Sequence, residues 1–126
     1  MPKPRHGKQN KQATEAGHHC HGRAWIEGAD GTFLGHGRVV LLERIRDTGS
    51  IAKAARSMEM SYKHAWDLVD SINRQATAPL VAKASGGRGG GGTTLTEAGE
   101  RAIQAFWSLH QRLQEFLAEE TKRLEL

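Results

Sequence analysis

The sequence is poor in cysteine and has no long apolar run. It contains one cysteine, Cys20, among 126 residues, so no disulfide can form within the chain and a reducing cytoplasm fits. No apolar run approaches the roughly 18 to 20 residues that span a bilayer. The first 25 residues contain no apolar stretch of the signal-peptide kind. We therefore expect a cytoplasmic, single-domain protein with a modest core and no membrane partner.

Positive charge is concentrated in two parts of the chain. The formal net charge is +4. Residues 1–23 and 38–95 each carry a net charge of +4, whereas residues 24–37 and 96–126 each carry −2. A basic block of this kind suits a polyanionic partner. Charge alone is equally consistent with an ordinary solvated surface.

The N-terminal part of the sequence predicts a tail followed by a hairpin. Residues 1–22 contain almost no large apolar side chains, and we expect a disordered, basic and histidine-rich tail. The remaining residues, 23–126, form the predicted folded domain. It begins with two short apolar pieces, 24–26 and 32–34, that flank the sequence Gly-Ala-Asp-Gly. This pattern indicates a β-hairpin.

The central sequence predicts a helix-turn-helix. Residues 38–47 have apolar positions at helical spacing, and Gly49 is a plausible helix stop. Ser50 and Ser61 then stand where helix N-caps are expected. Behind them, apolar residues repeat at helical spacing: Ile51, Ala54, Ala55 and Met58, then Ala65, Leu68, Val69 and Ile72. Two short helices with a tight connection are typical of a helix-turn-helix, although a generic helical hairpin would give a similar pattern.

The stretch ASGGRGGGGTTL at residues 84–95 contains a glycine-rich loop, 86–92, between two predicted strands, 80–84 and 93–95. Its spacing matches the dinucleotide fingerprint only weakly, because a second strand follows where a helix is needed. A P-loop would also need a lysine that is absent. Glycines suit a hairpin tip, and Arg88 could reach a phosphate backbone or narrow minor groove. We therefore predict the wing of a winged helix, made of Gly86, Gly87, Gly89, Gly90, Gly91 and Gly92 with Arg88.

The start of the second helix of the pair carries the candidate base-reading side chains. In helix-turn-helix proteins these N-terminal residues meet base edges in the major groove. Lys63 can donate to guanine or phosphate, and Asp67 could accept from cytosine or orient Lys63. Packing and capping remain simpler roles for Tyr62 and Ser61. The predicted DNA-binding residues are Ser50, Ser61, Tyr62, Lys63, His64, Asp67 and Arg88.

The C-terminal residues predict one long helix, 96–125, capped by Thr96. A helix running to Leu124 would be about 43 Å long, which a body this small cannot cover. We expect its start to pack in the core and its later part to form a homodimer seam; the alternative is a monomer with a frayed acidic end. The predicted dimerisation residues are Phe106, Leu109, Leu113, Phe116 and Leu117.

No constellation of catalytic residues stands out, and the sequence predicts no enzyme. Four potential metal ligands stand in a row: His18, His19, Cys20 and His21. Adjacent residues rarely all reach one ion, and no second ligand pair follows at zinc-finger spacing. A histidine-rich tail explains them more simply, which leaves adventitious binding of zinc, nickel or copper open.

The sequence also resembles a known family. The motif Ser-Tyr-Lys-x-Ala-Trp at 61–66, the glycine run at 86–92 and Leu-Thr at 95–96 are similar to the N-terminal domain of ModE-type molybdenum regulators. The resemblance to LysR-type winged helices is looser. The resemblance to ModE-type regulators implies a bacterial, cytoplasmic homodimer that is bound to the nucleoid at a palindromic operator. Ser61, Tyr62 and Lys63 would then lie on the operator-reading helix and Arg88 on the wing, whereas the family does not fix position 64.

The expected fold is mostly α with small β-hairpins: a winged helix-turn-helix with a long C-terminal dimerisation helix. Full-length members of the resembled family carry oxyanion-binding domains after the long helix, whereas this sequence ends at Leu126. We therefore expect no molybdate site and no cofactor. The expected function is sequence-specific regulation of molybdate-transport or molybdoenzyme genes. Two alternatives remain: an adaptor that dimerises through the long helix, and a nucleotide-binding enzyme that uses the glycine loop.

Overall fold

The computed structural model describes residues 17–84 and 92–126. The chain divides into two units. The first, called here the core unit, comprises Trp25–Phe106. The second, called here the terminal unit, combines the residues up to Ala24 with Trp107–Leu126. The long helix α4, Glu97–Lys122, contributes residues to both units.

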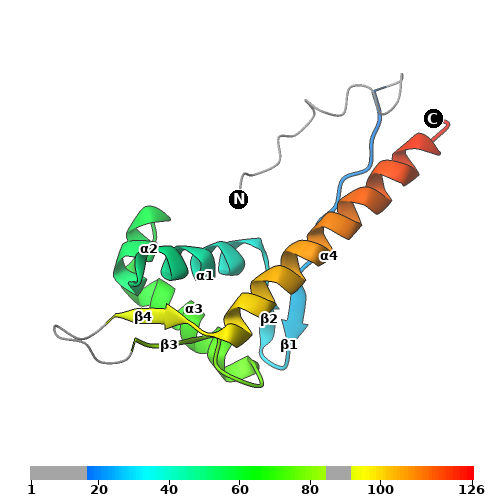
Figure 1. The fold of residues 1–126 in the computed structure, drawn as a ribbon. Coiled ribbons are helices and arrows are strands. Elements are labelled where there is room, and N and C mark those ends of the chain that lie inside the picture. The colour runs from blue at the N-terminus through cyan, green and yellow to red at the C-terminus, as the bar shows by residue number, and fades with distance from the viewer. Residues whose placement is uncertain (1–16, 85–91) are drawn as a thin grey trace. The chain divides into compact units, whose positions relative to one another are not determined.

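The core unit has the element order of a winged helix-turn-helix (Figure 1). Its elements are β1 (Ile26–Gly28), β2 (Gly31–Leu34), α1 (His36–Thr48), α2 (Ile51–Ser57), α3 (Tyr62–Gln75), β3 (Val81–Lys83), β4 (Thr93–Leu95) and the start of α4. β1 pairs with β2, and β3 pairs with β4, both antiparallel. The three helices α1, α2 and α3 gather together with β3 and β4 beside them. The predicted fold class is therefore confirmed.

Local capping chemistry sets the boundaries of the helix-turn-helix. Gly49 ends α1 in the left-handed region at φ 72°, where glycine has no side chain to strain. The Ser50 hydroxyl then accepts a hydrogen bond from the backbone N–H of Lys53 at 3.1 Å. The Ser61 hydroxyl accepts one from the N–H of His64 at 3.0 Å. Both serines satisfy amides that the first turn of a helix leaves unpaired, so both predicted N-caps are confirmed.

The core lies between the inner faces of α1, α2 and α3, and is closed by β3 and α4. Alanine residues on α2 and α3 allow the helices to approach closely. The buried apolar residues are Leu34, Val39, Leu41, Leu42, Ile45, Ala54, Ala55, Ala65, Val69, Ile72, Leu80, Val81, Ile103 and Phe106. The predicted stripe on α3 is buried at three positions, whereas Leu68 is half-buried. Phe106 is only 2 % exposed, so it is a core residue and not part of an open dimer seam as predicted.

In the terminal unit, residues 17–24 pack against the later part of α4. The backbone N–H of Cys20 donates to the Thr121 hydroxyl at 2.8 Å. The Gln114 side-chain amide donates to the Gly22 carbonyl at 3.1 Å. Disorder was predicted through residue 22, and for residues 17–22 this is wrong, because a helix face with matching polar groups holds them. Residues 1–16 lie outside the described part of the chain.

Within residues 17–84 and 92–126, none of the helices combines the length and the apolar character needed to cross a membrane.

Candidate nucleic-acid interface

The N-terminal turn of α3 presents three of the predicted DNA-binding residues to solvent. Tyr62, Lys63 and His64 are all exposed. The Ser61 hydroxyl is engaged in capping the helix, so its first role is to fix where α3 begins. This places the three exposed residues on the first turn, where recognition helices meet base edges.

Lys63 and Asp67 form an ion pair one turn apart, with Lys63 Nζ 3.0 Å from Asp67 Oδ2. Both side chains are exposed, so the pair contributes little to stability. Its effect is to hold the ammonium group over the second turn of α3. Of the two roles predicted for Asp67, the observed contact is the one that orients Lys63.

A second ion-pair cluster lies near the C-terminal end of α3. Arg74 donates to Asp70 and to Asp30, each at 3.0 Å. The hydrogen bond to Asp70 and the charge of that carboxylate raise the pKa of Arg74 most, and Asp30 adds a smaller contribution, despite some desolvation. Because Asp30 lies in the turn between β1 and β2, the cluster also joins α3 to that hairpin. The arginine and lysine charges of α3 are thus paired within the protein.

Cations with no ion-pair partner among the described residues flank α3. Lys53 and Arg56 lie on the exposed side of α2, opposite the buried Ala54 and Ala55, and Lys83 is exposed on β3. Cations on either side of a recognition helix suit contacts to DNA phosphates. The sequence prediction missed all three, although the helical spacing of α2 already places Lys53 and Arg56 away from its apolar stripe.

Trp66 is a further residue that the sequence prediction missed. It follows the buried Ala65 in the sequence, yet 46 % of it is exposed. Tyr62, one turn earlier, is 55 % exposed. The signal was available in the spacing, since residues i and i+4 share one side of a helix. These two aromatic rings lie next to Lys63 and Asp67 on the part of α3 that faces solvent.

Asn73 connects α3 to the base of the wing. Its side-chain amide donates to the Val81 carbonyl at 2.9 Å. Its carbonyl oxygen accepts from the backbone N–H groups of Leu80 at 2.9 Å and Val81 at 3.2 Å. One side chain thereby fixes the position of β3 relative to the recognition helix.

The opposite flank of α3 is tied to β2. Gln75 donates to the Thr32 carbonyl at 2.9 Å, and Arg38 donates to the Ser71 hydroxyl at 3.0 Å and more weakly to the Phe33 carbonyl. Partial burial lowers the pKa of Arg38, although an arginine remains charged at neutral pH. With Asn73 on one side and Gln75 on the other, α3 is held on both flanks.

The base of the wing is described, whereas its tip is not. Ala84 donates to the Gly92 carbonyl at 3.0 Å, and Thr93 donates to the Gly49 carbonyl at 2.9 Å. A Cβ on Gly92 would approach the Gly49 carbonyl to 3.1 Å, which explains a glycine there. The other predicted wing residues, Gly86, Gly87, Arg88, Gly89, Gly90 and Gly91, lie outside the described residues.

The terminal unit leaves part of its helix face open. Phe116 is 59 % exposed, and Leu109, seven residues earlier, is also exposed. Leu113 and Leu117 are half-buried, and a Leu117 methyl lies 3.2 Å from where a Cβ on Gly22 would stand. The N-terminal segment therefore covers one side of the predicted seam, and a dimer contact through the other side stays a prediction.

The histidine cluster shows no assembled metal site. The rings of His19 and His21 meet edge to face with centroids 4.1 Å apart. In the parts of the chain that the structure describes, no three His, Cys, Asp or Glu side chains are grouped closely enough to hold an ion. His18 and Cys20 therefore do not complete a site with them.

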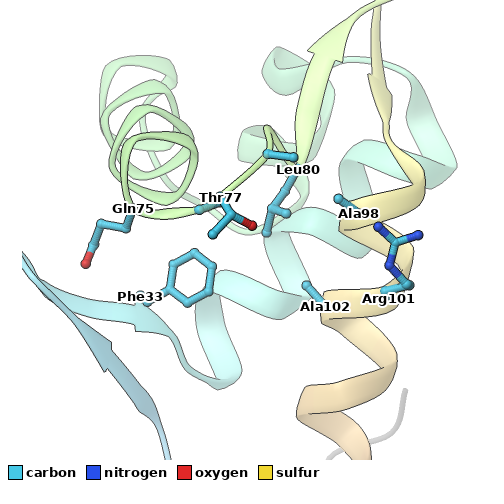
Figure 2. A pocket seen from close by; sticks show the side chains of 9 residues that line it. Phe33, Gln75, Thr77, Leu80, Ala98, Arg101 and Ala102 are labelled. Carbon is cyan, nitrogen blue, oxygen red and sulfur yellow. The ribbon is translucent and has the colours of Figure 1, made fainter.

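An open hollow of about 370 Å³ lies elsewhere on the core unit, and Figure 2 shows its lining. Phe33 of β2, Leu80 and the alanines of α4 line it, with Arg101 beside them. None of the predicted DNA-binding residues takes part. The hollow is thus separate from the exposed surface of α3.

A capped helix pair followed by a two-stranded hairpin defines the winged helix-turn-helix class of DNA-binding domains. The profile described as "Bacterial regulatory helix-turn-helix protein, lysR family" matches residues 37–100. The chain belongs to this family of DNA-binding transcriptional regulators. This assignment points away from an enzyme.

Three relatives with 42 to 44 % identity show which regulators of this family the chain resembles. The chain is 44 % identical over 94 residues to "Molybdenum transport protein ModE" of Azotobacter vinelandii, covering 75 % of this chain and 35 % of that protein. It is 42 % identical over 83 residues to "Transcriptional regulator ModE" of Haemophilus influenzae, covering 66 % and 32 %. It is 43 % identical over 74 residues to "DNA-binding transcriptional dual regulator ModE" of Escherichia coli, covering 59 % and 28 %. The predicted resemblance is confirmed, and the chain spans about a third of the length of these relatives.

Proposed function

We propose that the chain binds a palindromic DNA operator as a homodimer and regulates genes for molybdate transport or molybdoenzymes. The observation that carries the DNA-binding part is the exposed first half of α3, begun by the Ser61 cap and held by Asn73 and Gln75. The printed names of the relatives support the molybdenum part.

Each group of the interface has a distinct role in this proposal. Lys63 donates to a base edge in the major groove, and its pairing with Asp67 orients it before DNA arrives. Lys53 and Arg56 of α2, with Lys83 of β3, contact phosphates and set the register of the protein on the duplex. Arg88 reaches the backbone or minor groove from the wing. This interface needs no cofactor to bind DNA.

The exposed later part of α4 supports the proposed two-fold symmetry. Leu109 and Phe116 are exposed seven residues apart, which is the spacing of one helix face that packs against a second helix. A two-fold homodimer presents two recognition helices and therefore selects a palindrome with half-sites about one helical turn apart.

The primary test is selection of bound sequences from a random duplex pool at near-physiological salt, with and without molybdate. We expect a palindrome to be enriched equally in both conditions. A dimer that enriches no sequence would contradict the proposal and favour the adaptor. Enrichment that changes with molybdate would contradict the cofactor-free part alone.

Single substitutions then distinguish contacts to base edges from contacts to phosphates. Lys63→Ala is expected to weaken operator binding by about 1 to 3 kcal/mol and relax sequence preference. Arg56→Ala and Arg88→Ala should weaken all sequences alike and reduce the slope of log K against log salt by about 1 each. Arg101→Ala removes the same charge at the separate hollow and is the matched control. A salt slope that falls as much for Arg101→Ala would refute the assigned phosphate contacts.

A further inference from the structure

Two exposed aromatic side chains lie close together on α3, and one of them, Trp66, has no function in the interface described above. Tyr62 and Trp66 lie one turn apart, and about half of each is exposed. Single exposed apolar residues are common on protein surfaces, whereas neighbouring large ones on a recognition helix call for an explanation. Within the described residues the Trp66 indole N–H also has no hydrogen-bond partner.

The position of Trp66 on the helix is defined by its neighbours. Successive residues are rotated by about 100° around an α-helix. Trp66 therefore lies at the edge between two faces of α3: the buried face that carries Ala65 and Val69, and the exposed face that carries Lys63. Asn73 lies on the same flank, and it contacts β3. The indole thus borders the surface that runs from the outer face of α3 towards the wing strands.

The chemistry of this surface favours an apolar contact in the groove. Lys63 is already assigned to one base, and the other long basic side chain of α3, Arg74, is paired with Asp70 and Asp30. The major groove offers one apolar group, the C5 methyl of thymine, which aliphatic and aromatic side chains contact. Tyr62 ends in a hydroxyl that suits phosphate, which leaves the indole as the larger apolar surface.

Building on the proposed function, we propose that Trp66 is a specificity-determining residue that packs against a thymine methyl group of the operator. Trp66 then selects an A·T pair at one position of each half-site, next to the position read by Lys63. The alternative occupant of this surface is a protein partner, and the test below distinguishes it.

The test uses the selected operator with each thymine replaced in turn by uracil, which lacks only the methyl group and keeps the base-pairing edge. At one thymine per half-site we expect the dissociation constant of the wild-type chain to rise about four-fold, the factor for one buried methyl group. For Trp66→Ala, overall affinity should fall on every duplex, and the ratio at that thymine should approach one. This is a double-mutant cycle between a side chain and a methyl group.

Two further variants control for the fold and for aromatic loss in general. Trp66→Phe keeps an apolar ring and should retain most of the uracil effect. Trp25→Ala removes another tryptophan of the core unit, 54 % exposed and outside α3, and should leave the four-fold ratio unchanged. Circular dichroism melting of each variant establishes that the fold is retained.

The outcomes separate this inference from the function on which it rests. A wild-type chain that selects an operator but binds all uracil duplexes equally would overturn the role of Trp66. The same uracil ratio in Trp66→Ala and the wild type would do so too. Trp66→Ala with unchanged operator affinity would assign the surface to a protein partner instead. If no sequence is selected at all, the proposed function fails as well.

Discussion

Removing the side chain of Asn73 tests how firmly the recognition helix and the wing are coupled. The N–H of Thr96 donates to the Leu80 carbonyl, and the N–H of Ala84 donates to the Gly92 carbonyl. These two hydrogen bonds join the ends of β3 to the residues on either side of β4. Because such bonds alternate along an antiparallel strand, the N–H and carbonyl of Val81 point away from β4. They meet Asn73 instead.

The magnitude follows from what Asn73→Ala leaves behind. The Val81 carbonyl and the N–H groups of Leu80 and Val81 lose their partner, and both residues are buried. An unsatisfied buried group costs about 1 to 3 kcal/mol. Since the two N–H groups share one acceptor and some water can enter beside a half-buried residue, we expect a loss of about 2 to 4 kcal/mol in the free energy of unfolding.

Urea unfolding followed by circular dichroism measures this loss. Gln104→Ala, at an exposed position of α4, is the matched control and should change the free energy of unfolding by less than about 0.5 kcal/mol. If Asn73→Ala falls within the same small range, water satisfies these groups, and Asn73 does not couple α3 to the wing energetically.

The remaining predictions concern a cap, a close contact and a helix face. Ser61→Ala should lower the free energy of unfolding by about 1 kcal/mol through loss of the α3 cap, whereas Ser108→Ala on the exposed side of α4 should not; equal urea midpoints would contradict this. Gly99→Ala should cost about 1 to 3 kcal/mol in the same assay, because the added Cβ would stand 2.5 Å from the Leu80 carbonyl; a more stable variant would show that α4 shifts freely. Phe116→Glu should weaken dimerisation at least about ten-fold in analytical ultracentrifugation, and an unchanged dissociation constant would place the dimer contact elsewhere.

Local chemistry made most of the winged helix-turn-helix predictable. The caps at Ser50 and Ser61 and the left-handed stop at Gly49 act over three or four residues, so their signals stand in the sequence itself. The strand 93–95 was predicted at its observed bounds, and β3 was predicted one residue too long at each end. Strand ends depend on pairing with a partner, which propensity alone does not specify.

What the sequence could not predict depends on contacts between distant residues. The packing of residues 17–22 requires Thr121 and Gln114, which lie about a hundred positions further along the chain. Helical spacing grouped Phe106 with the outward-facing seam, but packing in the core unit buries it. For Trp66 no burial or exposure was predicted, and packing leaves about half of its side chain exposed.

The distribution of charge explains how affinity and sequence preference can be separate properties of this interface. Ion pairs within the protein compensate Lys63 and Arg74 on α3, whereas Lys53 and Arg56 on α2 have no such partner among the residues described. Release of counterions should therefore come mainly from α2 and the wing strands. Discrimination should come from Lys63 and Trp66, whose contacts depend on which base is present. Mutations on α2 should then change the salt slope of DNA binding without changing the selected sequence. Mutations at Trp66 should change the selected sequence without changing the salt slope.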